Sequence, residues 1–200
     1  MNLLKGQLRP AVGLTLVLCV VTGLAYPAVV TGLAQLLFPR QANGSLVTVG
    51  GRVVGSELIG QAFAQPWYFH PRPSAAGQGY DASASSGTNK GPTDRKLADT
   101  LIASAVDSVS KLDGAAKGAI PTDMVTASAS GLDPHISPAN AALQVARVAR
   151  ARGVSDDAVR TVLARHVEGR QLGFLGEPRV NVLLLNIALD SLLPRPGTAH

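Results

Sequence analysis

A stretch without charge near the N-terminus constrains this chain more than any other feature of its sequence. From Pro10 to Phe38 the chain carries no charged side chain and reads PAVGLTLVLCVVTGLAYPAVVTGLAQLLF. A helix needs about 20 apolar residues to cross the roughly 30 Å of hydrocarbon in a bilayer, so this stretch is long enough to span one. We therefore expect an N-terminal segment at residues 1–9, a transmembrane helix region at 10–38 and a larger domain at 39–200.

Other interpretations of the apolar stretch fit it less well. A cleaved signal peptide has an apolar core of only about 7–15 residues, although Gly32-Leu33-Ala34 imitates a cleavage site. A lipoprotein needs a small residue directly before its cysteine, whereas Leu18 precedes Cys19. A buried core helix is rarely apolar over such a length. The stretch is therefore interpreted as an uncleaved membrane span.

The charges on either side of the span predict its orientation. Lys5, Arg9 and the amino terminus precede it, whereas Arg40 is the only basic residue just after it. Basic residues are enriched on the cytoplasmic side of membrane helices. We therefore expect residues 1–9 in the cytoplasm and the domain at 39–200 outside it.

Small residues within the span suggest contact with other helices. Ala28 and Gly32 form a small-xxx-small pair, and Gly23 adds another small surface. Such residues let two helices approach closely. Pro27 lacks a backbone N–H and frees a carbonyl group, which neighbouring helices often satisfy in lipid. Gly23, Ala28 and Gly32 are therefore candidate partner contacts; the alternative is an anchor that touches only lipid.

The domain after the span shows the pattern of a mixed, mainly helical α+β fold with a β-hairpin. Two β-branched runs flank Gly50-Gly51, which is typical of a tight hairpin. Apolar residues at helical spacing and serine residues before helical stretches predict the helices. These helices are expected to begin at Asp94, Ser137, Ser155 and Asn181.

Two long segments between the expected elements are rich in Gly, Ser, Ala and Pro. They cover residues 66–92 and 118–137. A structureless loop of that length is uncommon inside a compact domain, so each segment is either mobile or functional. The aromatic residues Trp67, Tyr68 and Phe69 argue against a plain flexible linker.

Composition and motifs argue against several classes of site. The single cysteine, Cys19, allows neither an internal disulfide in the domain nor a cysteine zinc site. The histidines show no metal-ligand spacing, and the phosphate-binding motif GxxxxGK[ST] is absent. The net charge is +5, but only 4% of residues are aromatic and no nucleic-acid-binding signature is present. We expect no metal, no intrinsic cofactor and no nucleic acid.

One loop holds residues of the types that hydrolases use, namely Ser128, Ser130, Asp133 and His135. A catalytic triad needs a serine on a strained turn and a base that a third group orients, and no GxSxG is present. The ordinary interpretation is that these short side chains bond to backbone groups in an irregular loop. We predict no catalytic residue.

Arginines form a basic region over two of the predicted helices. Such a region is usually a solvated face, although it could meet anionic lipid or an acidic partner. Its members are Arg147, Arg150, Arg152, Arg160, Arg165 and Arg170.

Several segments of the chain resemble a known family. They read GSELIGQAF at 55–63, YFHPRPSAA at 68–76, SSGTNKGPT at 85–93, PTDMVTASASGLDPHISPANAALQVARVA at 121–149 and GEPRVNVLLLNIALD at 176–190. Together with the span, these segments cover nearly the whole chain in order. The chain resembles KdpC, the C subunit of the Kdp-type potassium-transporting ATPase.

The resemblance implies a non-catalytic accessory subunit of an ATP-driven high-affinity potassium importer in a bacterial plasma (inner) membrane. Its partners would be a channel-like subunit that binds potassium, a P-type ATPase subunit and membrane lipid. The C subunit of this family is needed for assembly and activity, and it would meet ATP only through the complex. Two unrelated classes stay open, a membrane-anchored extracytoplasmic enzyme and a free-standing binding module.

The resemblance also implies two alternative roles for the domain. In the first, a catalytic chaperone raises the ATP affinity of the ATPase subunit, and Gln144 is the glutamine that contacts nucleotide. In the second, the domain covers the extracytoplasmic mouth of the potassium-binding subunit as a gate or filter. The charges around the span favour the second role, because cytoplasmic ATP cannot reach an external domain. Gln144 would then be a helix-surface or capping residue.

Tyr68, Phe69 and Arg72, in the first of the glycine- and serine-rich segments, are candidate contacts with the partner subunits. Aromatic and arginine side chains dominate the energetics of protein interfaces. The alternative is that these three side chains pack inside the domain itself. The sequence leaves both interpretations open.

Overall fold

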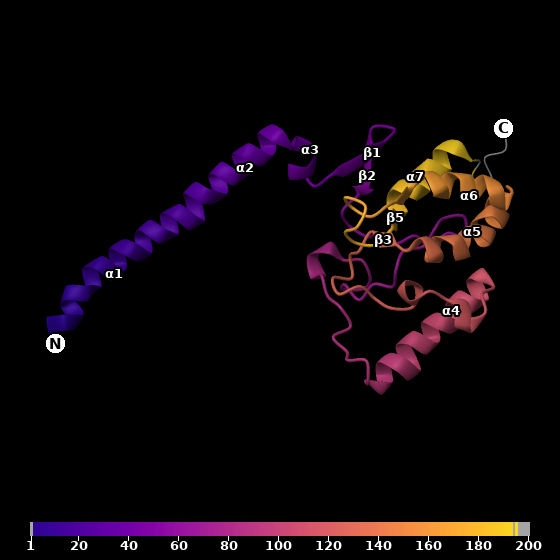
Figure 1. Ribbon diagram of the computed structural model, residues 1–200, viewed down its shortest axis with the longest axis horizontal. Coiled ribbons are helices and arrows are strands. Elements are labelled where there is room, and N and C mark those ends of the chain that lie inside the picture. The colour runs from indigo at the N-terminus through magenta and orange to yellow at the C-terminus, as the bar shows by residue number, and fades with distance from the viewer. Residues whose placement is uncertain (1, 194, 196–200) are drawn as a thin grey trace. The chain divides into compact units, whose positions relative to one another are not determined.

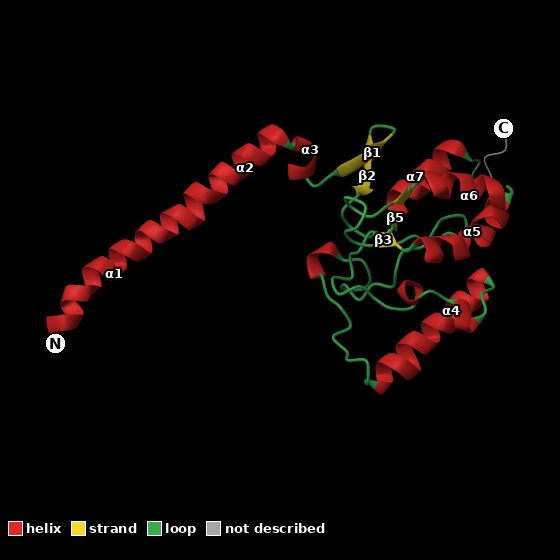
Figure 2. Ribbon diagram, in the orientation of Figure 1, coloured by secondary structure: helices red, strands yellow, loops and turns green. Residues whose placement is uncertain are grey.

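The computed structural model describes residues 2–193 and 195 (Figure 1). The chain divides into two compact units, which meet along the sequence at Leu46 and Val47. Helices and short strands both occur, with helices in the majority, so the predicted α+β class is confirmed (Figure 2).

A long apolar helix forms most of the first unit. It consists of α1 (Asn2–Val20), a π-helical turn (Val21–Ala25) and α2 (Tyr26–Leu37), and the short helix α3 (Pro39–Ala42) follows it. Among the described residues, Gly6–Leu37 is the one helical stretch long and apolar enough to cross a membrane. The predicted single apolar helix is confirmed, although helix begins well before Pro10.

Pro27 explains the π-helical turn in the middle of this helix. A proline inside a helix has no N–H to donate, and its ring clashes with the carbonyl group four residues earlier. Directly before Pro27, the N–H of Tyr26 bonds to the carbonyl of Val21, five residues back. This single widened turn accommodates the proline, so the helix continues through it instead of ending.

The predicted β-hairpin follows α3. Strands β1 (Leu46–Val49) and β2 (Arg52–Ser56) pair with each other, and Gly50-Gly51 connects them. Both glycines have positive φ angles, +56° and +78°. A two-residue turn of this kind matches the twist of the strands and favours glycine at both positions.

The second unit also contains a small antiparallel sheet. Its strand order is β3-β5-β4, with β3 (His135–Ile136), β4 (Val167–Glu168) and β5 (Arg179–Asn181). Val180 is central, because Ile136 stands opposite it on one side and Val167 on the other. The sequence did not predict this sheet.

Four helices complete the described part of the second unit. They are α4 (Ala103–Asp113), α5 (Pro138–Arg152), α6 (Asp156–Arg165) and α7 (Val182–Leu192). A π-helical stretch (Leu97–Ile102) precedes α4, and single 3-10 turns lie at Ala82–Ala84, Lys117–Ala119 and Thr122–Met124.

Side-chain caps fix the starts of three of these helices. The Oγ of Ser137 accepts a hydrogen bond from the N–H of Asn140, and Ser155 and Asn181 cap α6 and α7 in the same way. Such caps satisfy N–H groups that have no partner within the helix. The starts predicted at Ser137, Ser155 and Asn181 are confirmed.

The hydrophobic core lies between α5, α6, α7 and the small sheet. Val145 and Val148 of α5 belong to this core together with Leu185 and Leu189 of α7, and all four side chains are fully buried. Phe69, from the first glycine- and serine-rich segment, is part of the same cluster. The core therefore fixes the start of that segment on the helices.

Candidate functional site

The two glycine- and serine-rich segments are bound to each other and form one surface, which we call the loop junction. The Oγ of Ser74 donates a hydrogen bond to the carbonyl of Gly131 over 2.6 Å, and the N–H of Ser86 donates to the carbonyl of Ser130 over 3.0 Å. These bonds order both segments, although neither contains much regular structure. Both segments are therefore ordered parts of the domain and not flexible linkers.

Gly131 shows how closely the two segments approach. Its φ is +68°, a conformation that glycine adopts readily. A Cβ atom at this position would lie 2.7 Å from the amide nitrogen of Ala76 and from the carbonyl oxygen of Ser86. Any larger residue would therefore force the segments apart.

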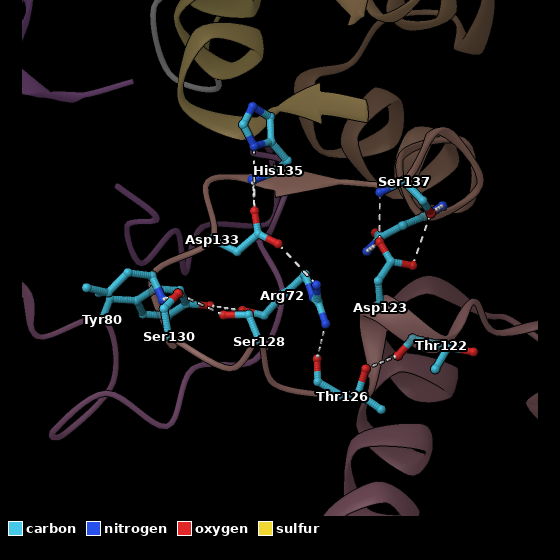
Figure 3. Close-up of polar contacts among 12 residues, drawn as sticks. Arg72, Tyr80, Thr122, Asp123, Thr126, Ser128, Ser130, Asp133, His135 and Ser137 are labelled. Carbon is cyan, nitrogen blue, oxygen red and sulfur yellow. Dashed lines mark hydrogen bonds and ion pairs between the residues drawn. The ribbon is translucent and has the colours of Figure 1, made fainter. Parts of the chain in front are cut away.

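Arg72 joins the two segments through Asp133 (Figure 3). Its Nη1 lies 3.1 Å from Oδ2 of Asp133, and Nη2 contacts the carbonyl of Thr126 at 3.5 Å. The other oxygen of Asp133 accepts a hydrogen bond from the N–H of His135. Burial raises the pKa of Asp133, but the hydrogen bonds from His135 and the charge of Arg72 outweigh it and keep the pKa below its ordinary value. The carboxylate is thus held in its charged form.

Asp123 fastens the second segment to the start of α5. It accepts hydrogen bonds from the N–H of Ser137 at 2.8 Å, from the Oγ of Ser137 at 3.0 Å and from Nδ2 of Asn140 at 2.9 Å. Arg72, Asp123 and Asp133 also border an open cavity of about 360 Å³, together with Glu177 and Arg179. This cavity presents both signs of charge, which suits a polar protein surface more than a single small ion.

The loop that resembled a hydrolase site does not bring a nucleophile and a base together. Ser128 and Ser130 face each other, with 3.5 Å between their Oγ atoms, and the Nδ1 of His135 lies 3.5 Å from Asp133. No hydrogen bond joins His135 to either serine among the described residues. Among all the residues that the structure describes, no group of three or more His, Cys, Asp and Glu side chains is placed to hold a metal ion.

Tyr68 and Phe69 differ in what they offer to a partner. Phe69 is 0% exposed, and both its backbone groups bond to the side-chain amide of Asn186. Tyr68 is half-buried, and its hydroxyl donates to Asp190 over 2.7 Å. Phe69 therefore packs inside the domain, which was the alternative interpretation, and its side chain has no exposed surface for a partner. Partner contact by Tyr68 and Arg72 stays a prediction.

Gln144 lies inside the domain and not on the helix surface, so the surface alternative is wrong. Its side chain is 1% exposed. Its Oε1 accepts from the N–H of His70 and from Arg147, and its Nε2 donates to the carbonyl of His70 and to Asn140. The amide thus holds the loop backbone against α5. Nucleotide contact by Gln144 stays a prediction, and it would compete with these internal bonds.

Two members of the basic region are also buried, so the solvated-face interpretation is wrong for them. Arg147 is 5% exposed and Arg152 is 4% exposed. Arg147 donates to the carbonyl groups of Pro66 and Tyr68, and Arg152 donates to the carbonyl of Trp67. The remaining arginines of the region, Arg150, Arg160, Arg165 and Arg170, are exposed.

Sequence reasoning missed these arginine clamps because their partners are backbone carbonyl groups far away along the chain. The available signal was weak: Gln144, Arg147 and Val148 lie three to four residues apart and share a helix face. A fully buried arginine is rare, so this pattern alone does not predict one.

The small residues of the span have free surface. Gly23, Ala28 and Gly32 are exposed, and apart from the adjoining residues and backbone of the helix itself no atom lies within 4 Å of a Cβ built on either glycine. Another helix can therefore approach closely at these positions, as the sequence predicted. That such a helix binds there stays a prediction.

Comparison with known proteins decides the family. Residues 8–191 match the family model of KdpC, described as K+-transporting ATPase, c chain. The chain belongs to the KdpC family. A potassium-transporting ATPase KdpC subunit of Gemmatimonas aurantiaca is 64% identical over 187 residues, which cover 93% of each chain. The protein of the same name from Koribacter versatilis is 56% identical over 96% of this chain and 98% of its own. The resemblance of the sequence to this family is confirmed.

Proposed function

We propose that this chain is the accessory C subunit of a potassium-transporting ATPase complex and is needed for its assembly and activity. The observation that carries the proposal is the KdpC match over residues 8–191, nearly the full chain. Relatives that share more than half of their residues with it are named as KdpC subunits of such ATPases. The alternatives of an independent enzyme or binding module have no comparable support.

In this proposal the apolar helix anchors the subunit in the bacterial inner membrane, with residues 1–9 in the cytoplasm. Lys5 and Arg9 before the span, against Arg40 after it, support this orientation. The domain then lies outside the cytoplasm, and the partners are a potassium-binding channel-like subunit and a P-type ATPase subunit. The exposed small residues of the span supply contacts between helices, and the loop junction supplies a surface for an external partner.

The structure favours a cover or filter over the potassium-binding subunit more than a catalytic chaperone. The chaperone role rests on contact between Gln144 and nucleotide, yet every polar atom of that side chain already bonds within the domain. The loop junction instead presents ordered polar groups, which can dock on another protein without a large loss of conformational entropy. We therefore place the domain over the external mouth of its partner.

The orientation is tested with single cysteines in a Cys19→Ser chain assembled with its pump. Ser104→Cys places a thiol on the exposed part of α4, and Gln7→Cys places one in the N-terminal segment 1–9, before the uncharged stretch at 10–38. In intact spheroplasts, an impermeant maleimide is expected to label Ser104→Cys at once and Gln7→Cys only after lysis. The reverse pattern would place the domain in the cytoplasm and would favour the catalytic-chaperone role instead.

A further inference from the structure

The helical segment 97–113, formed by the π-helical stretch and α4, packs loosely on its domain. Its residues are exposed or half-buried, although the side chain of Asp113 at its C-terminal end is only 1% exposed. Its apolar residues follow helical spacing on one face, as Leu97, Leu101, Ala105, Val109 and Leu112 show. A helix in a folded domain normally buries such a stripe. Here Leu101 keeps 38% and Leu112 46% of its surface exposed.

Two apolar cavities lie along the inner side of this segment. The first has a volume of about 310 Å³, and the second about 380 Å³. Pro73 and Ala105 line both cavities, so the two are neighbours and form one groove along the helix. Other apolar lining residues are Phe63, Met124, Leu97 and Val125. Protein cores rarely leave voids this large, whereas ligand pockets commonly have this size and lining.

Five of the six polar side chains that line the first cavity are already bonded elsewhere, and Ser108 is the sixth. Gln144 and Asn140 bond to each other, and Asp113 accepts from Arg147. The hydroxyl of Tyr80 donates to the carbonyl of Arg72, and the His70 ring lies 3.0 Å from the carbonyl of Gln65. The groove therefore offers little to a polar ligand and suits an apolar one.

Basic residues stand at the other end of the groove. Arg95 and Lys96 directly precede Leu97, which lines the second cavity. Both are exposed, and neither side chain forms an ion pair within the described part of the chain. Lys90, close by in sequence, pairs with Asp94. An apolar groove that ends at unpaired basic side chains is complementary to a molecule with an apolar tail and an anionic head.

We propose that this groove binds one acyl chain of an anionic amphiphile, with its head beside Arg95 and Lys96. Two adjoining cavities with apolar lining fit an unbranched chain, and a subunit with a membrane span meets acyl chains along that span. The occupant that we propose is a membrane phospholipid with an anionic head, because the subunit carries a membrane span; a free fatty acid is the alternative that the test distinguishes. The proposal goes beyond the assembly function, and neither depends on the other.

The test uses the full chain in phosphatidylethanolamine and phosphatidylglycerol vesicles. One arm contains a phosphatidylglycerol with a photoactivatable diazirine in its acyl chain, and the other receives a diazirine fatty acid. After illumination, mass spectrometry maps the adducts. We expect adducts on peptides of 97–113 in the first arm. Adducts on these peptides in the second arm alone would assign the groove to a free fatty acid and would overturn the binding of a membrane phospholipid. Adducts confined to residues 10–38 in both arms would overturn the proposal.

Matched variants separate binding in the groove from random contact. Ala105→Phe places a ring between the two cavities, whereas Ala103→Phe adds the same ring at an exposed position of the same helix. We expect adducts on 97–113 to fall about tenfold in Ala105→Phe, since the loss of about two buried methylene groups has that effect. In Ala103→Phe they are expected to stay unchanged. Equal yields in the two variants would overturn the proposal.

A further variant, with two substitutions outside the groove, covers the case in which Ala105→Phe disturbs folding. The double variant Arg95→Glu with Lys96→Glu leaves the groove intact and reverses the charge of its rim. It is expected to lower the adduct yield with an unchanged melting curve. A yield equal to that of the unaltered chain would show that the anionic head is not recognised, and it would overturn the proposal.

Discussion

Arg147 and Asp113 form a buried ion pair, with 2.7 Å between Nε and Oδ1 and side chains that are only 5% and 1% exposed. The pair joins α5 to the C-terminal end of α4. The same guanidinium donates to the carbonyl groups of Pro66 and Tyr68 over 2.6 and 2.9 Å. One side chain thus connects three segments that lie far apart in the sequence.

We predict that Arg147→Ala lowers the free energy of unfolding by about 3–5 kcal/mol, because removal of one partner leaves a buried charge without compensation. Urea unfolding of the purified full chain measures this change. Arg170→Ala is the control, since Arg170 forms an exposed pair with Glu177. Exposed pairs contribute little, so its unfolding midpoint is expected to stay unchanged. Similar small effects of both substitutions would contradict the assigned role of Arg147.

Gln144→Ala is predicted to destabilise the domain without changing the KM of the assembled pump for ATP. The substitution leaves the backbone of His70 and one donor of Arg147 without their partner. An unsatisfied buried group costs about 1–3 kcal/mol. The exposed Arg150→Ala on the same helix serves as control. A raised KM for ATP in a Gln144→Ala pump that stays folded would support nucleotide contact instead.

The role of Arg72 is resolved by comparing Arg72→Ala with Asp133→Asn. Both substitutions break the 3.1 Å ion pair at the loop junction and are expected to lower the melting temperature by similar, small amounts. The Arg72 side chain is 25% exposed, so a partner can still reach it. We predict that Arg72→Ala reduces potassium-stimulated ATPase activity more than Asp133→Asn does. Equal losses of activity would show that Arg72 acts only by holding the loops.

Gly32→Leu and Gly23→Leu are predicted to weaken co-purification of the subunit with its pump. A leucine at either position holds a neighbouring helix away from the backbone. Val29→Leu changes one large apolar residue to another on the same exposed helix and is the control. Carbonate extraction checks that every variant still inserts into the membrane. If both glycine variants co-purify normally, the span is a tether and not a packing surface.

Features encoded by short stretches of sequence could be predicted. The uncharged run gave the apolar helix, Gly50-Gly51 gave the hairpin, and Ser137, Ser155 and Asn181 gave helix starts. The hairpin and the helix starts depend on local conformational preferences of the chain. The apolar helix could be predicted because the length of the uncharged run is sufficient to cross a bilayer. None needs knowledge of which distant segments meet.

Features that depend on distant contacts were missed. Strands β3, β4 and β5 are two or three residues long, too short to show an alternating pattern. Arg147, Arg152 and Gln144 are buried because the carbonyl groups of the 66–70 segment lie against α5. Only the folded chain brings these donors and acceptors together, so the residue types alone favoured a solvated helix face.

His70 is expected to make stability depend on pH. Burial and, next, the charge of Arg147 lower the pKa of its ring below the ordinary 6.5. The unfolded chain therefore binds a proton more readily, so stability is complete above about pH 6.5 and falls as the pH drops towards the folded pKa. Urea midpoints at about pH 8 and about pH 5 measure the loss, which is predicted to be smaller in His70→Gln. Asp133 and Asp190, whose pKa values are also lowered, lose stability only at more acidic pH and affect both chains alike. Equal losses in the two chains would show that the His70 ring does not govern this dependence.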